Sequence, residues 1–226
     1  MMISLNSVPI LRLAPRAHLA YQRAFAGADP VLGRYGINVN ARRLAHFLAQ
    51  VLHESGELRV LTESLDYAVA ALLKTYVDVQ RPRMTRDQAL RFGRTATRRA
   101  DQPAIANAIY GGAWGRKNLG NTEAGDGWLY RGHGLMQLTG RANARRISIR
   151  LREELGVEVD LVATPALAFD SRFALHIAGI FWADASCSAA ADRDDVEAVT
   201  RAINGGVNGL PERRALRLRV GQLLAA

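Results

Sequence analysis

The sequence has a single cysteine among 226 residues, and aromatic residues make up only 7% of it. One cysteine, Cys187, excludes an intrachain disulfide and suits synthesis in a reducing compartment. No apolar run approaches the ~18 residues that cross a bilayer, and the first residues lack the basic and apolar regions of a secretory signal peptide. No group of His, Cys and Asp has metal-ligand spacing, and there is no phosphate-binding loop. We therefore expect neither a metal nor another cofactor.

Acidic residues are outnumbered, with 21 against 30 lysines and arginines, which gives a net charge of +9 at pH 7. This balance indicates an anionic partner. Nucleic acid fits the charge, but the arginines are spread over several segments and no helix-turn-helix, zinc-knuckle or RRM pattern is present, so we expect no nucleic-acid partner. The acidic polymers of a cell wall fit equally well, and a positive field raises the rate of encounter with them. An arginine bias of a GC-rich genome is the alternative explanation.

The chain shows no internal repeat, no low-complexity linker and no separate wall-binding module, which predicts a single domain over residues 1–226. Its composition, 49% hydrophobic and 23% charged, is that of a globular protein. Helical spacing of apolar residues predicts a mostly α fold. The expected helices cover residues 12–26, 40–54, 85–92, 103–110, 170–186, 195–203 and 211–224. The glycine-rich stretch 111–140 is expected to form loops and short extended segments.

Two carboxylates lie nine residues apart in unlike surroundings. Glu54 continues the apolar stripe of the helix over 40–54 at its exposed end. Partial desolvation there should favour the protonated form, which a general acid needs. Glu63 follows in a more polar stretch, where we expect it to stay ionised. Such a pair is the minimum apparatus of a glycosidase, although by itself it is weak evidence, because most close acidic pairs are solvated.

The middle of the chain carries a more specific motif. Residues 130–139 read YRGHGLMQLT, and Asn143 follows. This run resembles the glycoside hydrolase family 19 motif Tyr-x-Gly-Arg-Gly-x-x-Gln-Leu-Ser/Thr with its downstream Asn. Residues 45–56 are similar to the catalytic-acid helix of that family, and residues 181–182 and 199–206 resemble two further landmarks in the expected order.

The resemblance covers residues 31–219, almost the whole chain, and implies a lysozyme-like fold with two helical lobes flanking a substrate cleft. The short loops favour the phage endolysin and bacterial branch of the family over the cysteine-rich plant chitinases. Two positions depart from the pattern. His133 stands where the motif has Arg, which removes a guanidinium from that point, and Glu57 stands where relatives often have Gly. Neither change touches the carboxylates.

The resemblance also implies an inverting reaction and roles for single residues. Glu54 is expected to protonate the glycosidic oxygen and Glu63 to take a proton from the attacking water. Thr139 is expected to hold that water, because a hydroxyl both donates and accepts. The residues expected to bind substrate are Gln137, Asn143, Asn204, Tyr130 and Arg131. Retention, with a carboxylate as nucleophile, is the alternative, and a hydroxyl that holds water favours inversion.

Several acidic and polar residues have a simpler interpretation beside the catalytic one. Glu123 and Asp126 lie in a glycine-rich turn and are expected to fix loop hydrogen bonds. Asn204 could simply end a helix before two glycines. His53 could tune the neighbouring Glu54 or merely pack. Cys187 has no nucleophile motif around it, and we interpret it as a small buried side chain.

We therefore expect an endolysin that hydrolyses β-1,4 bonds of peptidoglycan glycan strands, made in the host cytoplasm and acting in the periplasm as a monomer. A bacterial chitinase is the alternative, because chitin and glycan strands share N-acetylglucosamine. A noncatalytic basic protein that binds cell wall or nucleic acid is a third hypothesis. Such a binding module would not need Glu54, Glu63 and Thr139 together.

The last expected helix is basic and amphipathic. Its arginines surround apolar residues in the set Arg213, Arg214, Leu216, Arg217, Arg219, Val220 and Leu223. This pattern could bind anionic lipid or lipopolysaccharide. The alternative is a core helix with a solvated basic face, which Pro211 and the short preceding loop favour.

Overall fold

The computed structural model describes residues 3–5 and 10–225 and is mostly α-helical, as the sequence predicts. The signal-peptide expectation rests partly on residues 1–2 and 6–9, which lie outside the described residues. The helices are α1 (Ile10–Leu13), α2 (Leu19–Phe25), α3 (Ala28–Arg34), α4 (Ala41–Glu54), α5 (Val69–Leu72), α6 (Arg86–Phe92), α7 (Gln102–Tyr110), α8 (Gly112–Leu119), α9 (Asp126–Leu129), α10 (Arg141–Leu155), α11 (Ala174–Asp184), α12 (Cys187–Asp192), α13 (Val196–Asn204) and α14 (Leu210–Ala225), with a π-helical turn η2 (Leu73–Val77) and a 3-10 turn η3 (Pro165–Phe169).

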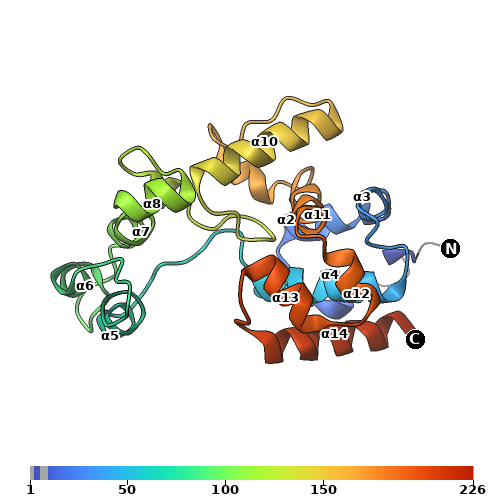
Figure 1. Cartoon of the computed structure of the whole chain (residues 1–226), viewed down its shortest axis with the longest axis horizontal. Coiled ribbons are helices and arrows are strands. Elements are labelled where there is room, and N and C mark those ends of the chain that lie inside the picture. Colours follow the sequence, from blue (N-terminus) through green and yellow to red (C-terminus); the bar gives the residue numbers. More distant parts are fainter. Residues whose placement is uncertain (1–2, 6–9, 226) are drawn as a thin grey trace.

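The helices form two lobes (Figure 1). The large lobe packs α1 to α4 and α10 to α14 around two groups of buried side chains, and the small lobe packs α5 to α9 around a third. Phe181 packs against both groups of the large lobe, which makes them one core. The segment 55–68 leads from α4 into the small lobe, and the segment 130–140 leads back to α10. Both connections therefore run between the lobes.

Helix α4 is the centre of the large lobe. The Asn40 side chain accepts a hydrogen bond from the Arg43 amide at 2.9 Å and caps its start. Every residue over 44–52 is buried, and α14 lies along the helix. Trp182 of α11 is buried and meets Phe47 edge to face, with ring centroids 5.8 Å apart. This packing fixes α4 along its length up to its last residue, Glu54.

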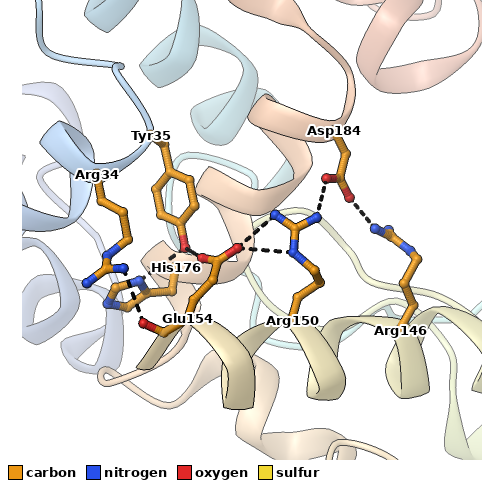
Figure 2. A network of polar contacts seen from close by, with 7 residues as sticks. All are labelled: Arg34, Tyr35, Arg146, Arg150, Glu154, His176 and Asp184. Atoms are coloured by element: carbon orange, nitrogen blue, oxygen red, sulfur yellow. Dashed lines mark hydrogen bonds and ion pairs between the residues drawn. The ribbon is translucent and has the colours of Figure 1, made fainter. Parts of the chain in front are cut away.

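A polar network attaches α10 to the rest of the large lobe (Figure 2). The Tyr35 hydroxyl, just after α3, donates a hydrogen bond to Glu154 at 2.6 Å. Arg150 donates to the same carboxylate through Nε and Nη2. Arg150 and Arg146 also bind Asp184 at the end of α11. The two arginines thus link α10 to the end of α11, and the Tyr35 hydroxyl links α10 to the residue that follows α3.

The helix prediction is wrong in several parts, and it also missed the short helices α3, α5 and α12. The expected helix over 12–26 is interrupted between α1 and α2, where Pro15 has no amide hydrogen to donate. The stretch 111–140, expected to lack regular helix, contains α8 and α9. Helix α10 was not expected, because its five arginines obscure the apolar face that Ala144, Ile147 and Leu151 bury.

The arginines of α14 are paired with carboxylates. Arg213 binds Glu54, and the three other pairs are Arg214–Glu197 at 3.5 Å, Arg217–Asp194 at 2.6 Å and Arg219–Glu57 at 2.8 Å. Arg213 is 2% exposed, so the alternative of a solvated basic face fails at this residue. In the parts of the chain that the structure describes, no helix has the length and hydropathy to span a membrane. The helix is therefore docked on the core, with much of its charge already neutralised.

The close contact between α11 and Tyr35 predicts opposite effects for two glycine-to-alanine substitutions. A Cβ at Gly179 would lie 2.1 Å from Tyr35 Cδ2, whereas one at Gly221 of α14 would meet only Arg217 Nη1 at 3.5 Å. Overpacking at a buried site costs about 1–3 kcal/mol, and alanine is favoured over glycine in an open helix position by up to about 1 kcal/mol. We expect Gly179→Ala to lower the free energy of unfolding in urea and Gly221→Ala to raise it slightly. Equal changes in the free energy of unfolding for the two variants would contradict the close contact between Gly179 and Tyr35.

Candidate active site

Glu54 is held by a buried arginine. Its side chain is 22% exposed at the end of α4, and Arg213 of α14, with a side chain 2% exposed, donates from Nη2 to its Oε1. Nη1 of the same guanidinium donates to Gln50, one turn earlier in α4. The expectation that Glu54 has apolar surroundings is wrong in this respect, because its carboxylate contacts the Arg213 guanidinium. Arg213 lies 159 residues after Glu54 in the sequence. The helical spacing of apolar residues around Glu54 therefore could not predict this contact.

The loop before α14 completes this side of the site. The Asn208 carbonyl accepts from Arg213 Nε at 3.2 Å and from Asn204 Nδ2 at 3.4 Å. Gly209 takes a positive φ of 69° and packs so tightly on the His53 ring that a Cβ there would lie 2.2 Å from it. Burial, with the Arg213 charge, lowers the pKa of His53. Asn204 ends α13, as its simpler interpretation says, yet it also shares a carbonyl with the residue that holds Glu54.

Glu63 lies on the segment between the lobes and is fixed from both sides. Its Oε1 accepts from the Tyr110 hydroxyl at 2.8 Å, and its Oε2 accepts from the Gly132 amide at 3.2 Å. The Glu63 amide donates in turn to the Gly132 carbonyl at 2.8 Å. Burial and the neighbouring carboxylate raise the pKa of Tyr110, so this hydroxyl stays a donor. A carboxylate with two fixed donors keeps one orientation while remaining half-exposed.

The central motif folds as a compact hairpin beside Glu63. His133 pairs with Thr62 and with Leu138 through antiparallel bridges. Gln137 takes a positive φ of 49°, and its carbonyl accepts from the Thr139 hydroxyl at 2.9 Å. The Thr139 carbonyl then accepts from Asn143 Nδ2 at 2.8 Å. Since the Thr139 hydroxyl donates to the chain, its oxygen keeps lone pairs that can accept a hydrogen bond from water.

Comparison with known proteins identifies the family. No protein-family model matches the chain. A glycosyl hydrolase family 19 domain-containing protein of Haemophilus influenzae is 35% identical over 175 residues, which cover 77% of this chain and 76% of that protein. The chain belongs to glycoside hydrolase family 19. The protein is therefore a glycoside hydrolase, and the resemblance found in the sequence is confirmed.

Solved structures support the same fold. Chitinase C from Streptomyces griseus has a TM-score of 0.57 at 19% identity and covers 99% of this chain and 93% of that chain. A bacterial family 19 chitinase has a TM-score of 0.59 at 20% identity, covering 100% and 96%. A class IV chitinase from Zea mays has a TM-score of 0.51 at 18% identity, covering 95% and 85%. The expected mostly α, lysozyme-like fold is confirmed.

Two residues of the family 19 motif have unlike places in the structure. Tyr130 is 3% exposed, and its hydroxyl donates to the Val162 carbonyl at 3.0 Å. This position argues against a contact with sugar and assigns the ring to the core. Arg131 is half-buried beside Glu63 and lies over the Trp128 ring, 3.4 Å from its centroid. Of the two, only Arg131 keeps part of its side chain exposed to solvent.

The departure at His133 has a local explanation. The ring is buried, stacks on Phe169 with 10° between the planes, and binds the Arg131 carbonyl through Nδ1. Burial lowers the pKa of His133, so the ring is neutral near pH 7. An apolar stacking contact thus takes the place of the ion pair that the arginine of family 19 could make.

A further ion pair, between Asp126 at the start of α9 and Arg141 at the start of α10, joins the small lobe to the large lobe. Asp126, 2% exposed, accepts from Arg141 Nε at 2.8 Å and Nη2 at 2.6 Å. Asn121 bridges the lobes, because it donates to the Tyr110 carbonyl and accepts from the Arg141 amide, each at 2.9 Å. The expectation that Asp126 fixes the loop is confirmed.

The residues that the motif did not reveal are partners of the two glutamates. Arg213 and Gln50 hold one side, and Tyr110 holds the other. Gln50 could have been suspected, because a polar side chain four residues before Glu54 lies on its helix face. Among the described residues, no group of His, Cys, Asp and Glu could hold a metal ion.

The Asp126–Arg141 pair predicts a pH-dependent stability. Burial alone would raise the pKa of Asp126, but the Arg141 guanidinium and the Glu123 amide lower it below its usual value. The ionised carboxylate therefore stabilises the fold above its unfolded pKa of about 3.9, and this contribution is lost as the pH falls through the lower folded value. We expect Asp126→Asn to lower the free energy of unfolding by about 3 kcal/mol near neutral pH. Below pH ~4, the free energy of unfolding of the variant should fall less steeply than that of the wild type.

Urea unfolding at a series of pH values measures both effects. Asp78→Asn is the matched control, because Asp78 and its partner Arg86 are 51% and 58% exposed and such pairs contribute about 0–1 kcal/mol. If the free energy of unfolding depends on pH in the same way for the wild type and Asp126→Asn, the ionised Asp126 carboxylate does not stabilise the fold as proposed.

Proposed function

We propose that this glycoside hydrolase is an endolysin that cleaves β-1,4 bonds of peptidoglycan by an inverting acid/base mechanism. The observation that carries the mechanism is the unlike support of the two carboxylates. Glu54 is held by a cation from the large lobe, and Glu63 is held by neutral donors from the segment between the lobes and from the small lobe. Two carboxylates with different partners suit two different proton tasks.

Glu54 acts as the general acid. In its protonated form Glu54 gives its proton to the glycosidic oxygen as the bond to the anomeric carbon breaks, and the carboxylate that remains is the anion that pairs with Arg213. Arg213, already in contact with Oε1, stabilises the negative charge that this step leaves behind. The buried guanidinium needs no rearrangement at that moment, because Gln50 and the Asn208 carbonyl hold it.

Glu63 acts as the general base. It takes a proton from a water that attacks the anomeric carbon from the opposite face. The Thr139 oxygen accepts a hydrogen bond from that water and orients it. Tyr110 and Gly132 keep the Glu63 carboxylate in one orientation, which reduces the entropy lost on reaching the transition state.

Neutral amides supply the remaining contacts with the substrate. Asn143 follows the central hairpin, Gln137 lies within it, and the partly free Asn204 amide lies near the Arg213 loop. Amides bind N-acetyl groups and hydroxyls without competing for the catalytic proton. We assign these three residues to sugar binding.

The net charge of +9 favours an acidic wall over neutral chitin. The second candidate, a bacterial chitinase, is favoured by the chitinases among its structural neighbours. Binding of anionic lipid or lipopolysaccharide through α14 has less support, because its arginines already pair with carboxylates. We further propose that the enzyme is made in the cytoplasm and acts on the wall as a monomer.

Removing the acid tests the mechanism. Glu54→Gln keeps an acceptor for Arg213 but has no proton to transfer, so lysis of permeabilised Gram-negative cells should fall by ~10² or more. The variant should also melt earlier, because Arg213 loses its anion, so rates are compared well below both melting temperatures. Glu57→Gln is the control: its carboxylate is 41% exposed and pairs with Arg219, and we expect activity within about twofold of the wild type. Near-full activity of a folded Glu54→Gln would refute the assignment.

The products decide between the two substrates and the two stereochemical courses. Mass spectrometry of a digest of purified peptidoglycan, beside a digest of chitin oligosaccharides, should show faster release of wall fragments. Proton NMR of a soluble oligosaccharide digest, read before mutarotation, should show the α anomer first. An initial β anomer would exclude Glu63 as the base, and cleavage of chitin alone would favour the chitinase.

A further inference from the structure

Arg131 is fixed rigidly beside the Glu63 carboxylate. Its guanidinium lies 3.4 Å from the centroid of the Trp128 ring, and its Nη1 donates to the Trp128 carbonyl at 2.7 Å. The backbone at Trp128 is in turn attached to the small lobe, because its amide donates to the Asn107 side chain of α7 at 3.0 Å. The ring contact and the hydrogen bond to the Trp128 carbonyl together hold the guanidinium beside the indole.

This guanidinium has no anion of its own. Of the residues that the structure describes, none forms an ion pair with Arg131, although the side chain is half-buried. Its Nε is fully buried and has no hydrogen-bond partner among them. Glu63 is near enough to favour the charged guanidinium, yet its oxygens bind Tyr110 and Gly132. Withdrawing a cation from water without a partner is costly, so this arrangement suits a site whose anion arrives with the ligand.

We propose that Arg131 is a specificity-determining residue that binds a carboxylate of the glycan beside the scissile bond. Because Nη1 already donates to the Trp128 carbonyl and Nε is buried, Nη2 is the nitrogen left to donate a charge-assisted hydrogen bond to a carboxylate. The position is one that the family 19 motif leaves variable, between its Tyr and its Gly. Arg131 would thus select an acidic glycan within a reaction shared with chitinases.

Chitin and peptidoglycan differ in their negative charge, and a role for Arg131 in telling them apart rests on the proposed function. Chitin is a neutral chain of N-acetylglucosamine. Peptidoglycan carries a lactyl group on alternate sugars, which ends either in a free carboxylate or in an amide to a stem peptide with carboxylates of its own. Either source supplies the anion that Arg131 lacks. The alternative is that Arg131 serves only Glu63, through its field, in which case it would act on every substrate alike.

Binding separates these two roles. Three ligands of matched length are titrated calorimetrically into the Glu54→Gln protein: a chitin oligosaccharide, a peptide-free peptidoglycan strand with free lactyl carboxylates, and the same strand with stem peptides. We expect Arg131→Gln on this background to weaken binding of at least one acidic ligand by about 10- to 100-fold more than binding of chitin. The acidic ligand that responds identifies the source of the carboxylate. Arg131→Lys should restore part of the loss, because it keeps the charge without the planar fork.

The control is Arg145→Gln, which removes the same charge from an exposed side chain and should affect all three ligands equally. Equal losses for chitin and the acidic strands in Arg131→Gln, or no loss at all, would overturn the proposal. If Glu54→Gln does not fold, the same ratio is taken from kcat/KM of otherwise wild-type enzyme, with the loss expected in KM. Hydrolysis by the wild type is scored separately. If it cleaves only chitin, the endolysin assignment fails; if it cleaves peptidoglycan but Arg131→Gln is unselective, only this inference fails.

Discussion

The buried contact between Arg213 and Glu54 is the constraint on which the arrangement of the large lobe depends. A guanidinium that is 2% exposed needs an anion and several acceptors, and Glu54, Gln50 and the Asn208 carbonyl supply them. These partners come from α4 and from the loop before α14. The requirement to satisfy one buried cation therefore sets how the two helices dock and where the catalytic acid points.

The second carboxylate depends on a different principle. Glu63, on the first segment that joins the lobes, is positioned by neutral groups on the second joining segment and on α7. The Gly132 backbone binds it through both its amide and its carbonyl, and Tyr110 binds it through its hydroxyl. Asn121 and the Asp126–Arg141 pair then tie this junction to α10. The small lobe thus supports the base through Tyr110, and the large lobe is tied to the same junction through Arg141.

Local features of the sequence predicted much of this structure, because they depend on neighbouring residues. Asn40 caps α4, Thr85 and Gln88 form a capping box at the start of α6, and Asp195 caps α13, each through a residue three positions away in the sequence. Helix α10 escaped prediction because its binding partners, Tyr35 and Asp184, come from other helices. Its arginines look like a solvated surface until those partners are in place.

The candidate site shows the same limit. The carboxylates and the hairpin could be found from the motif, but Arg213 and Tyr110 lie 159 and 47 residues from the groups that they hold. Tyr130 shows the opposite error, since a motif records which residue is present and not which way its side chain faces. Its ring completes the core under the hairpin.

The place of α14 in the chain also has a consequence for biosynthesis. It is the last helix that the structure describes, and it carries the cation that orients a carboxylate made some 159 residues earlier. A ribosome-bound chain that has not yet released this segment has Glu54 without its partner. Assembly of this contact therefore waits until α14 has left the ribosome, and a protein shortened before α14 would carry both glutamates without the cation that orients Glu54.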